Sequence, residues 1–155
     1  MRLYSHYKGC ETLKFLLGVT PSGLICYVSK VYGGRASDKA IFNQSGLLKK
    51  VIPTKEAIMV DKGFDIEVEC AENHIKLIMP PKLGKRNQFS KEEVEVTVDI
   101  AAARVHVERA IQRFKQFKIV KGKVQATLIP YMDKITTVIV AICNLKNPIL
   151  ADNKF

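Results

Sequence analysis

The sequence predicts a single domain of the α/β class. Short apolar runs bounded by turn residues alternate with segments of helical periodicity, in the order strand, strand, helix, strand, helix, strand, helix, helix. The length of 155 residues is that of about one domain, and 47% of the residues are hydrophobic. That content supplies a core and excludes an intrinsically disordered chain, which has low hydrophobicity.

A β-hairpin is expected near the N-terminus. Its strands are the apolar, partly β-branched runs 12–19 and 24–32. The connecting residues 20–23 place Pro21 second and Gly23 fourth, which suits a type I turn.

A helix, a strand, a short helix and a second strand are predicted next. Ser37 can cap a helix that has Asp38 in its first turn and runs to about Lys50. The apolar run 57–60 is bounded by charge and has the pattern of a buried parallel strand. A short helix follows it, and residues 75–79 form the next strand.

Two helices are predicted in the C-terminal half of the chain. Ser90 and Glu93 have the spacing of a capping box, which marks a helix start. Three valines in the range 94–98 alternate as in a strand, but the longer periodicity that follows them favours one helix throughout. A last helix is expected from Pro130 to just before Pro148. The apolar stripe of the first of these helices is Ile100, Ala103, Val107, Ala110, Ile111, Phe114 and Phe117.

The balance of charge indicates either a polyanionic partner or a soluble protein that is merely basic, and the position of the charged residues must decide between them. The chain has 25 lysines and arginines against 15 aspartates and glutamates, a formal net charge of +10. Such a charge suits nucleic acid or an anionic membrane surface. The longest uninterrupted apolar run near the C-terminus, 138–143, is too short to cross a bilayer. We expect no membrane partner. The four cysteines are widely spaced and form no zinc or disulfide pattern.

Basic side chains concentrate in the loop 82–91 and in the helix that follows it. Glu108 is the only acid between Ile100 and Lys123, where seven residues are basic. Solvated helix faces usually mix both signs, so contact with phosphate groups is favoured here. The residues predicted to make that contact are Lys82, Lys85, Arg86, Arg104, Arg109, Arg113 and Lys115.

Two carboxylates are candidates for chemistry. Asp61 follows the strand 57–60, at the end of the sheet where open α/β sheets bind ligands, and Gly63 allows a sharp turn beside it. Glu108 lies at the border of the apolar stripe, from which it can lean toward the strand ends. Each residue has an ordinary alternative. Asp-x-Gly is common turn chemistry, and Glu108 can be a surface partner of Arg104 or Arg109.

Four segments of the chain together resemble the DDE superfamily endonuclease domain of PIF/Harbinger-like transposases. They are residues 4–42 (YSHYKGC to DKAIF), VDKGFDIE, IKLIMPPKLGKRNQFSKEEV and IAAARVHVERAIQRFKQFKIV. The match covers nearly the whole chain with its order and spacing intact. The resemblance implies a ribonuclease H-like fold, a mixed sheet flanked by helices. It also implies DNA strand cleavage by two divalent ions, Mg²⁺ or Mn²⁺, held by an Asp-Asp-Glu triad.

By this resemblance, Asp61 is the second aspartate of the triad and Glu108 is its glutamate, so both are expected to be catalytic and metal-binding. Asp38 matches a motif acid that we interpret as positional. The first aspartate normally lies upstream of the Y-S-x-Y-K motif, and only Met1-Arg2-Leu3 precede that motif here. We therefore expect residues 1–155 to form one DDE-type domain that is incomplete at its N-terminus and lacks the central first strand.

Three consequences follow from the missing strand. We expect a gap or an improvised pairing between the strands 12–19 and 57–60, which the central strand would otherwise join. We also expect little or no nuclease activity from this chain alone, and Asp38 or Asp65 are the acids to test if activity is found. The purified chain is expected to be marginally stable or oligomeric, because unpaired buried strand edges are costly.

DNA is the partner that the resemblance implies, together with a homo-oligomer or a separate DNA-binding protein, and the nucleus is the expected location. The alternative function is a non-catalytic DNA-binding or assembly module derived from a transposase. A third possibility is an expressed relic with no selected function. Metal-dependent nicking separates the enzyme from the binding module, and DNA affinity at physiological salt separates the module from the relic.

Overall fold

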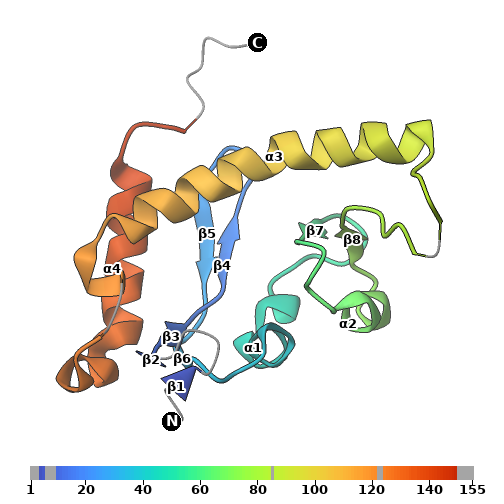
Figure 1. Cartoon of the computed structure of the whole chain (residues 1–155). Coiled ribbons are helices and arrows are strands. Elements are labelled where there is room, and N and C mark those ends of the chain that lie inside the picture. The colour runs from blue at the N-terminus through green and yellow to red at the C-terminus, as the bar shows by residue number, and fades with distance from the viewer. Residues whose placement is uncertain (1–3, 6–9, 85, 122–123, 150–155) are drawn as a thin grey trace.

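The computed structural model describes residues 4–5, 10–84, 86–121 and 124–149, which form a mixed α/β chain (Figure 1). Among these residues there are four two-stranded sheets, four α-helices and three 3₁₀-helices. In chain order they are β1 Tyr4–Ser5, β2 Cys10–Glu11, β3 Leu13–Lys14, β4 Leu17–Val19, β5 Ile25–Val28, β6 Tyr32–Gly33, α1 Asp38–Ser45, η1 Leu47–Lys49, β7 Ala57–Met59, α2 Glu67–Glu72, β8 Lys76–Ile78, α3 Lys91–Lys115, η2 Lys118–Val120, η3 Ala126–Tyr131 and α4 Met132–Leu145.

The predicted β-hairpin is confirmed, although its two strands are broken into shorter pieces. β4 pairs antiparallel with β5, and β3 pairs antiparallel with β6. The turn is closed by the amide of Gly23, which donates to the carbonyl of Thr20 at 2.8 Å. Between the two ladders, the Ser29 hydroxyl accepts from the amide of Leu16 at 2.8 Å. A side chain therefore replaces one backbone bond of the hairpin and interrupts the strands.

Helix α1 begins as predicted but ends earlier than Lys50. The Ser37 hydroxyl accepts from the amide of Ala40 at 3.1 Å, and Asp38 lies in the first turn. The helix ends at Ser45 because Gly46 adopts the left-handed conformation, with φ at 78°, that stops α-helices. The 3₁₀-helix η1 follows directly.

Strands β7 and β8 are parallel, as predicted, and α2 connects them. The prediction that 57–60 is a buried strand is wrong. Ala57 is exposed and Met59 is 37% exposed, whereas Ile58 between them packs against the core cluster of α1 and α2. A strand is buried on both faces only within a larger covered sheet, and β7 has one partner among the described residues.

Strands β4 and β7 belong to different sheets, and each is paired on one side only in the described part of the chain. Figure 1 shows the β4–β5 hairpin and the β7–β8 pair as separate units beneath α3. The α/β class is thus confirmed, and the gap expected between 12–19 and 57–60 is present. The described residues do not form the continuous mixed sheet of the predicted fold.

Two hydrophobic clusters hold these units. The first lies where α3 and α4 pack on the hairpin, and the second joins α1, α2 and β8. The apolar stripe predicted for α3 is confirmed, with three of its residues buried and the other four half-buried. The three valines at the start of α3 are helical and exposed. The buried members of the two clusters are Ile25, Ala110, Phe114, Ile139 and Cys143 in the first and Phe42, Ile66, Cys70 and Ile75 in the second.

Polar side chains of helix α4 form hydrogen bonds with backbone groups of β5 and of the segment that follows it. Asn144 accepts from the amide of Ile25 and donates to its carbonyl, both at 3.0 Å. The carboxylate of Asp133 accepts from the amide of Val31 at 2.7 Å. The helical stretch Ala126–Leu145 contains an 18-residue window with a mean hydropathy of 1.4, and by length and composition only it is long and apolar enough to cross a membrane. Its inner face packs on β5 and α3, which also calls for apolar side chains.

Candidate active site at Asp61, Arg104 and Glu108

Asp61 lies where the chain leaves β7. The amide of Val60 still bonds to the carbonyl of Ile78, and the chain then turns. Within that turn, the Asp61 carboxylate accepts from the amide of Lys62 at 2.7 Å, and its carbonyl accepts from the amide of Phe64 at 3.0 Å. The ordinary turn chemistry of Asp-x-Gly is therefore present, yet the side chain remains 61% exposed and available to a partner.

Gly63 does not have the special role that the sequence suggested. Its φ lies outside the left-handed region, and an added Cβ would meet nothing within 4 Å. The turn beside Asp61 is thus formed by ordinary backbone conformations and by the bonds that Asp61 itself accepts.

Glu108 comes from the middle of α3 and shares a cation with Asp61. Arg104, one helical turn before Glu108, donates from Nη1 to Oδ1 of Asp61 at 3.1 Å and from Nη2 to Oδ2 at 3.3 Å. The same Nη2 lies 3.7 Å from Oε1 of Glu108. The two predicted catalytic carboxylates therefore meet at one guanidinium, although they come from different elements.

One guanidinium against two carboxylates leaves the cluster with one net negative charge, and the cluster is open to solvent. Two carboxylates that approach each other repel, and the guanidinium placed against both offsets that repulsion. The side chains of Asp61 and Glu108 are 61% and 62% exposed, and that of Arg104 is 34% exposed. The surface ion pair that was the ordinary alternative for Glu108 is formed, and Asp61 belongs to the same cluster.

The donor atoms at this site fit a hard divalent ion in kind. Carboxylate oxygens are the ligands of Mg²⁺, which usually takes one or two of them and completes its coordination with water and substrate phosphate. Within the described ranges, no three His, Cys, Asp or Glu residues are close enough together to hold a metal ion. Asp38 and Asp65 pair with lysines instead, Asp38 with Lys14 at 3.1 Å and Asp65 with Lys39 at 3.6 Å. Asp61 and Glu108, by contrast, share one basic partner, Arg104.

The described basic residues of the loop 82–91 form ion pairs with acids. Lys82 lies 2.7 Å from Glu67, which raises the pKa of the lysine. Arg86 donates to both oxygens of Glu93, at 3.1 and 2.7 Å, and its presence lowers the pKa of Glu93. Lys85 lies outside the described residues. Lys82 and Arg86 are thus balanced by acids of the protein itself.

The basic residues of α3 divide into two kinds. Arg113 is half-buried and donates to the carbonyl of Asn147 at 2.6 Å, which ties α3 to the segment after α4. Arg109 and Lys115 are exposed, and no acidic side chain of the described chain lies within ion-pair distance of either. Among the basic residues predicted on α3, these two have no such partner in the described part of the chain.

The acids that balance the basic loop were missed by reasoning from the sequence. Glu67 is in α2, 15 residues before Lys82, and nothing in the local pattern indicates their contact. The same holds for Asp61 and Arg104, which are 43 residues apart. The contact between Arg86 and Glu93 is partly indicated by the sequence, because the capping box predicts that the Glu93 carboxylate points back toward the start of the helix.

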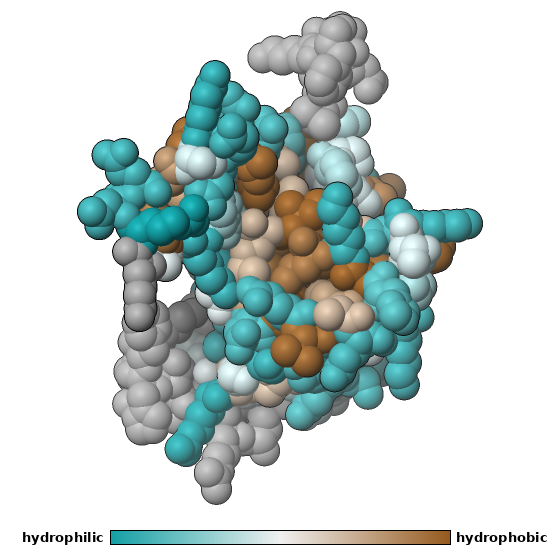
Figure 2. Space-filling model, turned by 90° about the vertical axis from the view of Figure 1, so that its right-hand side faces the viewer, coloured by the Kyte–Doolittle hydropathy of each residue, from teal (hydrophilic) through white to brown (hydrophobic). Residues whose placement is uncertain are grey.

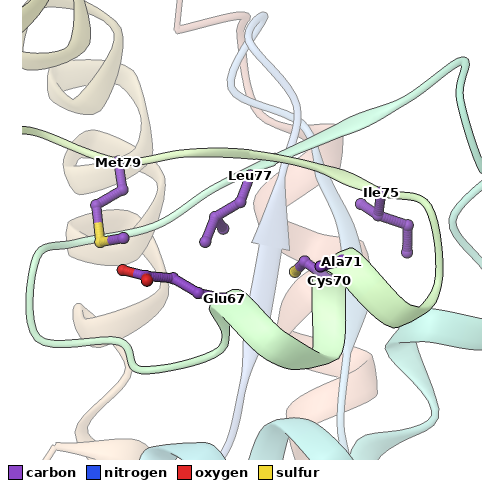
Figure 3. A pocket seen from close by; sticks show the side chains of 6 residues that line it. All are labelled: Glu67, Cys70, Ala71, Ile75, Leu77 and Met79. Atoms are coloured by element: carbon purple, nitrogen blue, oxygen red, sulfur yellow. The ribbon is translucent and has the colours of Figure 1, made fainter.

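A shallow, open pocket lies away from these carboxylates. It has a volume of about 370 Å³ and is lined by Glu67, Cys70, Ala71, Ile75, Leu77 and Met79. Figure 3 shows these side chains between α2 and the segment 75–79, which contains β8. Figure 2 shows hydrophobic surface at the centre of the face that carries β7, β8 and α2. The pocket is mostly apolar and shares no residue with the candidate active site.

Comparison with known proteins shows the family of the chain. The family model described as DDE superfamily endonuclease matches residues 1–144, which include β7, Asp61, all of α3 and most of α4. No curated protein and no solved structure matches the chain significantly. The matched region contains both carboxylates that converge on Arg104, and it spans nearly the whole chain. The chain belongs to the DDE superfamily endonucleases.

Proposed function

We propose that this chain is a transposase-derived, metal-dependent DNA endonuclease domain of the PIF/Harbinger type, with Asp61 and Glu108 as its catalytic, metal-binding carboxylates. The observation that supports this most is the meeting of the two carboxylates at Nη2 of Arg104. Members of the family are nucleases that generally use divalent metal ions. Phosphodiester bonds of DNA are the substrate that the family implies.

Asp61 and Glu108 would hold Mg²⁺ or Mn²⁺. When bound, the ion polarises the phosphodiester and activates the attacking water. The turn after β7 fixes the Asp61 carboxylate through the amide of Lys62, and the rigid helix α3 fixes Glu108. Arg109 and Lys115, exposed on the same helix, hold the DNA backbone by charge, without reading its sequence.

A ribonuclease H-like sheet accounts for the separation of β4 from β7. In this proposal a central strand lies between them, pairs with both, and carries the first acid of the triad. The free edges of β4 and β7 among the described residues are compatible with such a strand. The nucleus is the proposed location, and a second copy or a separate DNA-binding protein is the proposed further partner.

The test combines metal binding with nicking of supercoiled DNA. Wild type, Asp61→Asn and Glu108→Gln are titrated with Mn²⁺, and the free ion is followed by electron paramagnetic resonance. Glu72→Gln, an exposed carboxylate of α2, is the matched control. We expect both site variants to lose Mn²⁺ binding and the control to retain it, with weak nicking that follows Mn²⁺ binding. Mn²⁺ binding or nicking that survives both site substitutions would overturn the proposal.

A non-catalytic DNA-binding module is the second candidate. It is favoured by the absence of a three-ligand metal cluster in the described part of the chain, and by the guanidinium that occupies both carboxylates. DNA binding that is equally strong with and without Mn²⁺, together with no nicking, would select this candidate.

A further inference from the structure

We infer that Arg104 is a built-in cation that competes with divalent metal for Asp61 and Glu108 and is released when it binds a DNA phosphate. Metal and DNA would then load together, and the DNA-free protein would hold metal weakly. This inference rests on the proposed function, because it takes the two carboxylates to be metal ligands.

The first step is that Arg104 uses the oxygens that a metal ion needs. Its two terminal nitrogens bond to both carboxylate oxygens of Asp61, at 3.1 and 3.3 Å, and one of them also lies 3.7 Å from Glu108. A divalent ion would have to sit on the same oxygens at about 2.0–2.1 Å. Two cations on one pair of carboxylates repel each other, so each weakens the binding of the other.

The second step is that Arg104 can leave the carboxylates and bind a phosphate group. Its side chain is 34% exposed, and the ion pair with Asp61 is open to water, so its rupture costs little. The planar fork of a guanidinium binds phosphate as well as it binds carboxylate. Arg109 and Lys115 lie further along the same helix and are exposed, so a DNA backbone drawn to α3 would bring phosphates toward Arg104.

The third step is thermodynamic. If DNA binding removes Arg104 from the carboxylates, it raises their affinity for metal, and metal must then raise the affinity for DNA by the same factor. Arg104 would thus be a positioning residue that weakens metal binding until substrate arrives. Its side chain was assigned to phosphate contact from the sequence, and the structure adds its contacts with both acids.

The experiment measures Mn²⁺ affinity of the full chain by electron paramagnetic resonance, without DNA. Arg104→Gln removes the cation, Arg104→Lys keeps the charge but loses the fork, and Arg35→Gln is the matched loss of charge at an exposed site in the loop before α1. We expect Arg104→Gln to bind Mn²⁺ about threefold to tenfold more tightly than wild type. Arg104→Lys would fall between them, and Arg35→Gln would match wild type.

A second measurement follows the coupling itself. The affinity for a labelled duplex is measured by fluorescence anisotropy with and without Mn²⁺, at constant ionic strength. In wild type we expect Mn²⁺ to tighten DNA binding, and in Arg104→Gln we expect this gain to shrink. Circular dichroism checks that the variants fold, and if Arg104→Gln does not, the intermediate affinity of Arg104→Lys carries the test.

The outcomes separate the inference from the proposed function. If wild type binds Mn²⁺ and Asp61→Asn does not, but Arg104→Gln binds Mn²⁺ no better than wild type, the metal site stands and the inference is wrong. If neither wild type nor Arg104→Gln binds Mn²⁺ at a site that needs Asp61, the proposed function fails and the inference fails with it.

Discussion

Arg104 and Asp61 form a forked ion pair between the middle of α3 and the turn that follows β7. Nη1 lies 3.1 Å from Oδ1, Nη2 lies 3.3 Å from Oδ2, and the two residues are 43 positions apart in the chain. The same helix packs over the β4–β5 hairpin, so this pair joins the smaller β7–β8 unit to the hairpin side of the molecule. The candidate site therefore lies where the two units of the fold meet.

Removal of the cap of α3 is expected to destabilise the chain. The Ser90 hydroxyl accepts from the amide of Glu93 at 3.2 Å, and the Glu93 carboxylate accepts from the amide of Ser90 at 2.9 Å. Ser90→Ala leaves one of these amides without a partner and should cost about 0.5–2 kcal/mol in the free energy of unfolding. Urea denaturation measures the loss, and Ser90→Asp, which can still cap the helix, should recover most of it. Equal stability of Ser90→Ala and wild type would show that the cap is not formed.

Stability is expected to fall at acid pH in part through Glu93. The Arg86 side chain and then the Ser90 amide hold the pKa of Glu93 below its ordinary value of 4.5. A carboxyl with a lowered pKa in the folded state stabilises that state above the unfolded pKa, and the contribution is lost as pH falls through the folded pKa. Thermal midpoints of wild type should therefore drop below about pH 4.5 more steeply than those of Glu93→Gln. Equal drops in wild type and Glu93→Gln would show that Glu93 does not contribute to the loss of stability at acid pH.

Gly23 is expected to tolerate substitution less well than Gly46. Both have left-handed backbones, with φ at 88° and 78°, so alanine costs roughly 1–2 kcal/mol of conformational strain at either position. At Gly23 an added Cβ would also lie 2.8 Å from the side chain of Ile149, whereas at Gly46 it would meet open space. Unfolding free energies should show the larger loss for Gly23→Ala, and Ile149→Ala in that background should return part of it. Equal losses at the two glycines would contradict the contact with Ile149.

The elements that the sequence predicted correctly are those whose signals are local. The hairpin turn, the Ser37 cap, the Ser90–Glu93 capping box and the apolar stripe of α3 each depend on residues no more than four positions apart along the chain. The end of α1 was misjudged because Gly46 stops the helix by its own left-handed conformation, not by a change in the apolar pattern. The burial of 57–60 was misjudged because burial depends on how many strands surround a strand, and β7 has one neighbour among the described residues.

The candidate site was predictable in its acids but not in its contacts. The resemblance supplied Asp61 and Glu108, and the helical spacing supplied the pair Arg104 and Glu108. The fork between Arg104 and Asp61 joins two elements, so it depends on how the fold places α3 against β7. For the same reason, the sequence predicts phosphate contact for Lys82 but does not predict its ion pair with Glu67 in the folded chain.

Lysines with and without acidic partners are expected to differ in their effect on DNA binding. Lys115 is exposed and has no acidic partner in the described part of the chain, whereas Lys82 lies 2.7 Å from Glu67. A side chain that neutralises a phosphate releases counterions, and each such contact adds roughly 0.9 to the slope of log affinity against log salt concentration on B-DNA. Lys115→Gln should therefore reduce the slope by about one, and Lys82→Gln by less than half of that. Fluorescence anisotropy with a short duplex over a range of NaCl concentrations measures both slopes.

A triple variant of Arg109, Arg113 and Lys115 should lower the slope most. An unchanged slope in that variant would place the DNA contact on another surface, and a larger effect of Lys82→Gln than of Lys115→Gln would mean that DNA displaces Glu67 from its lysine.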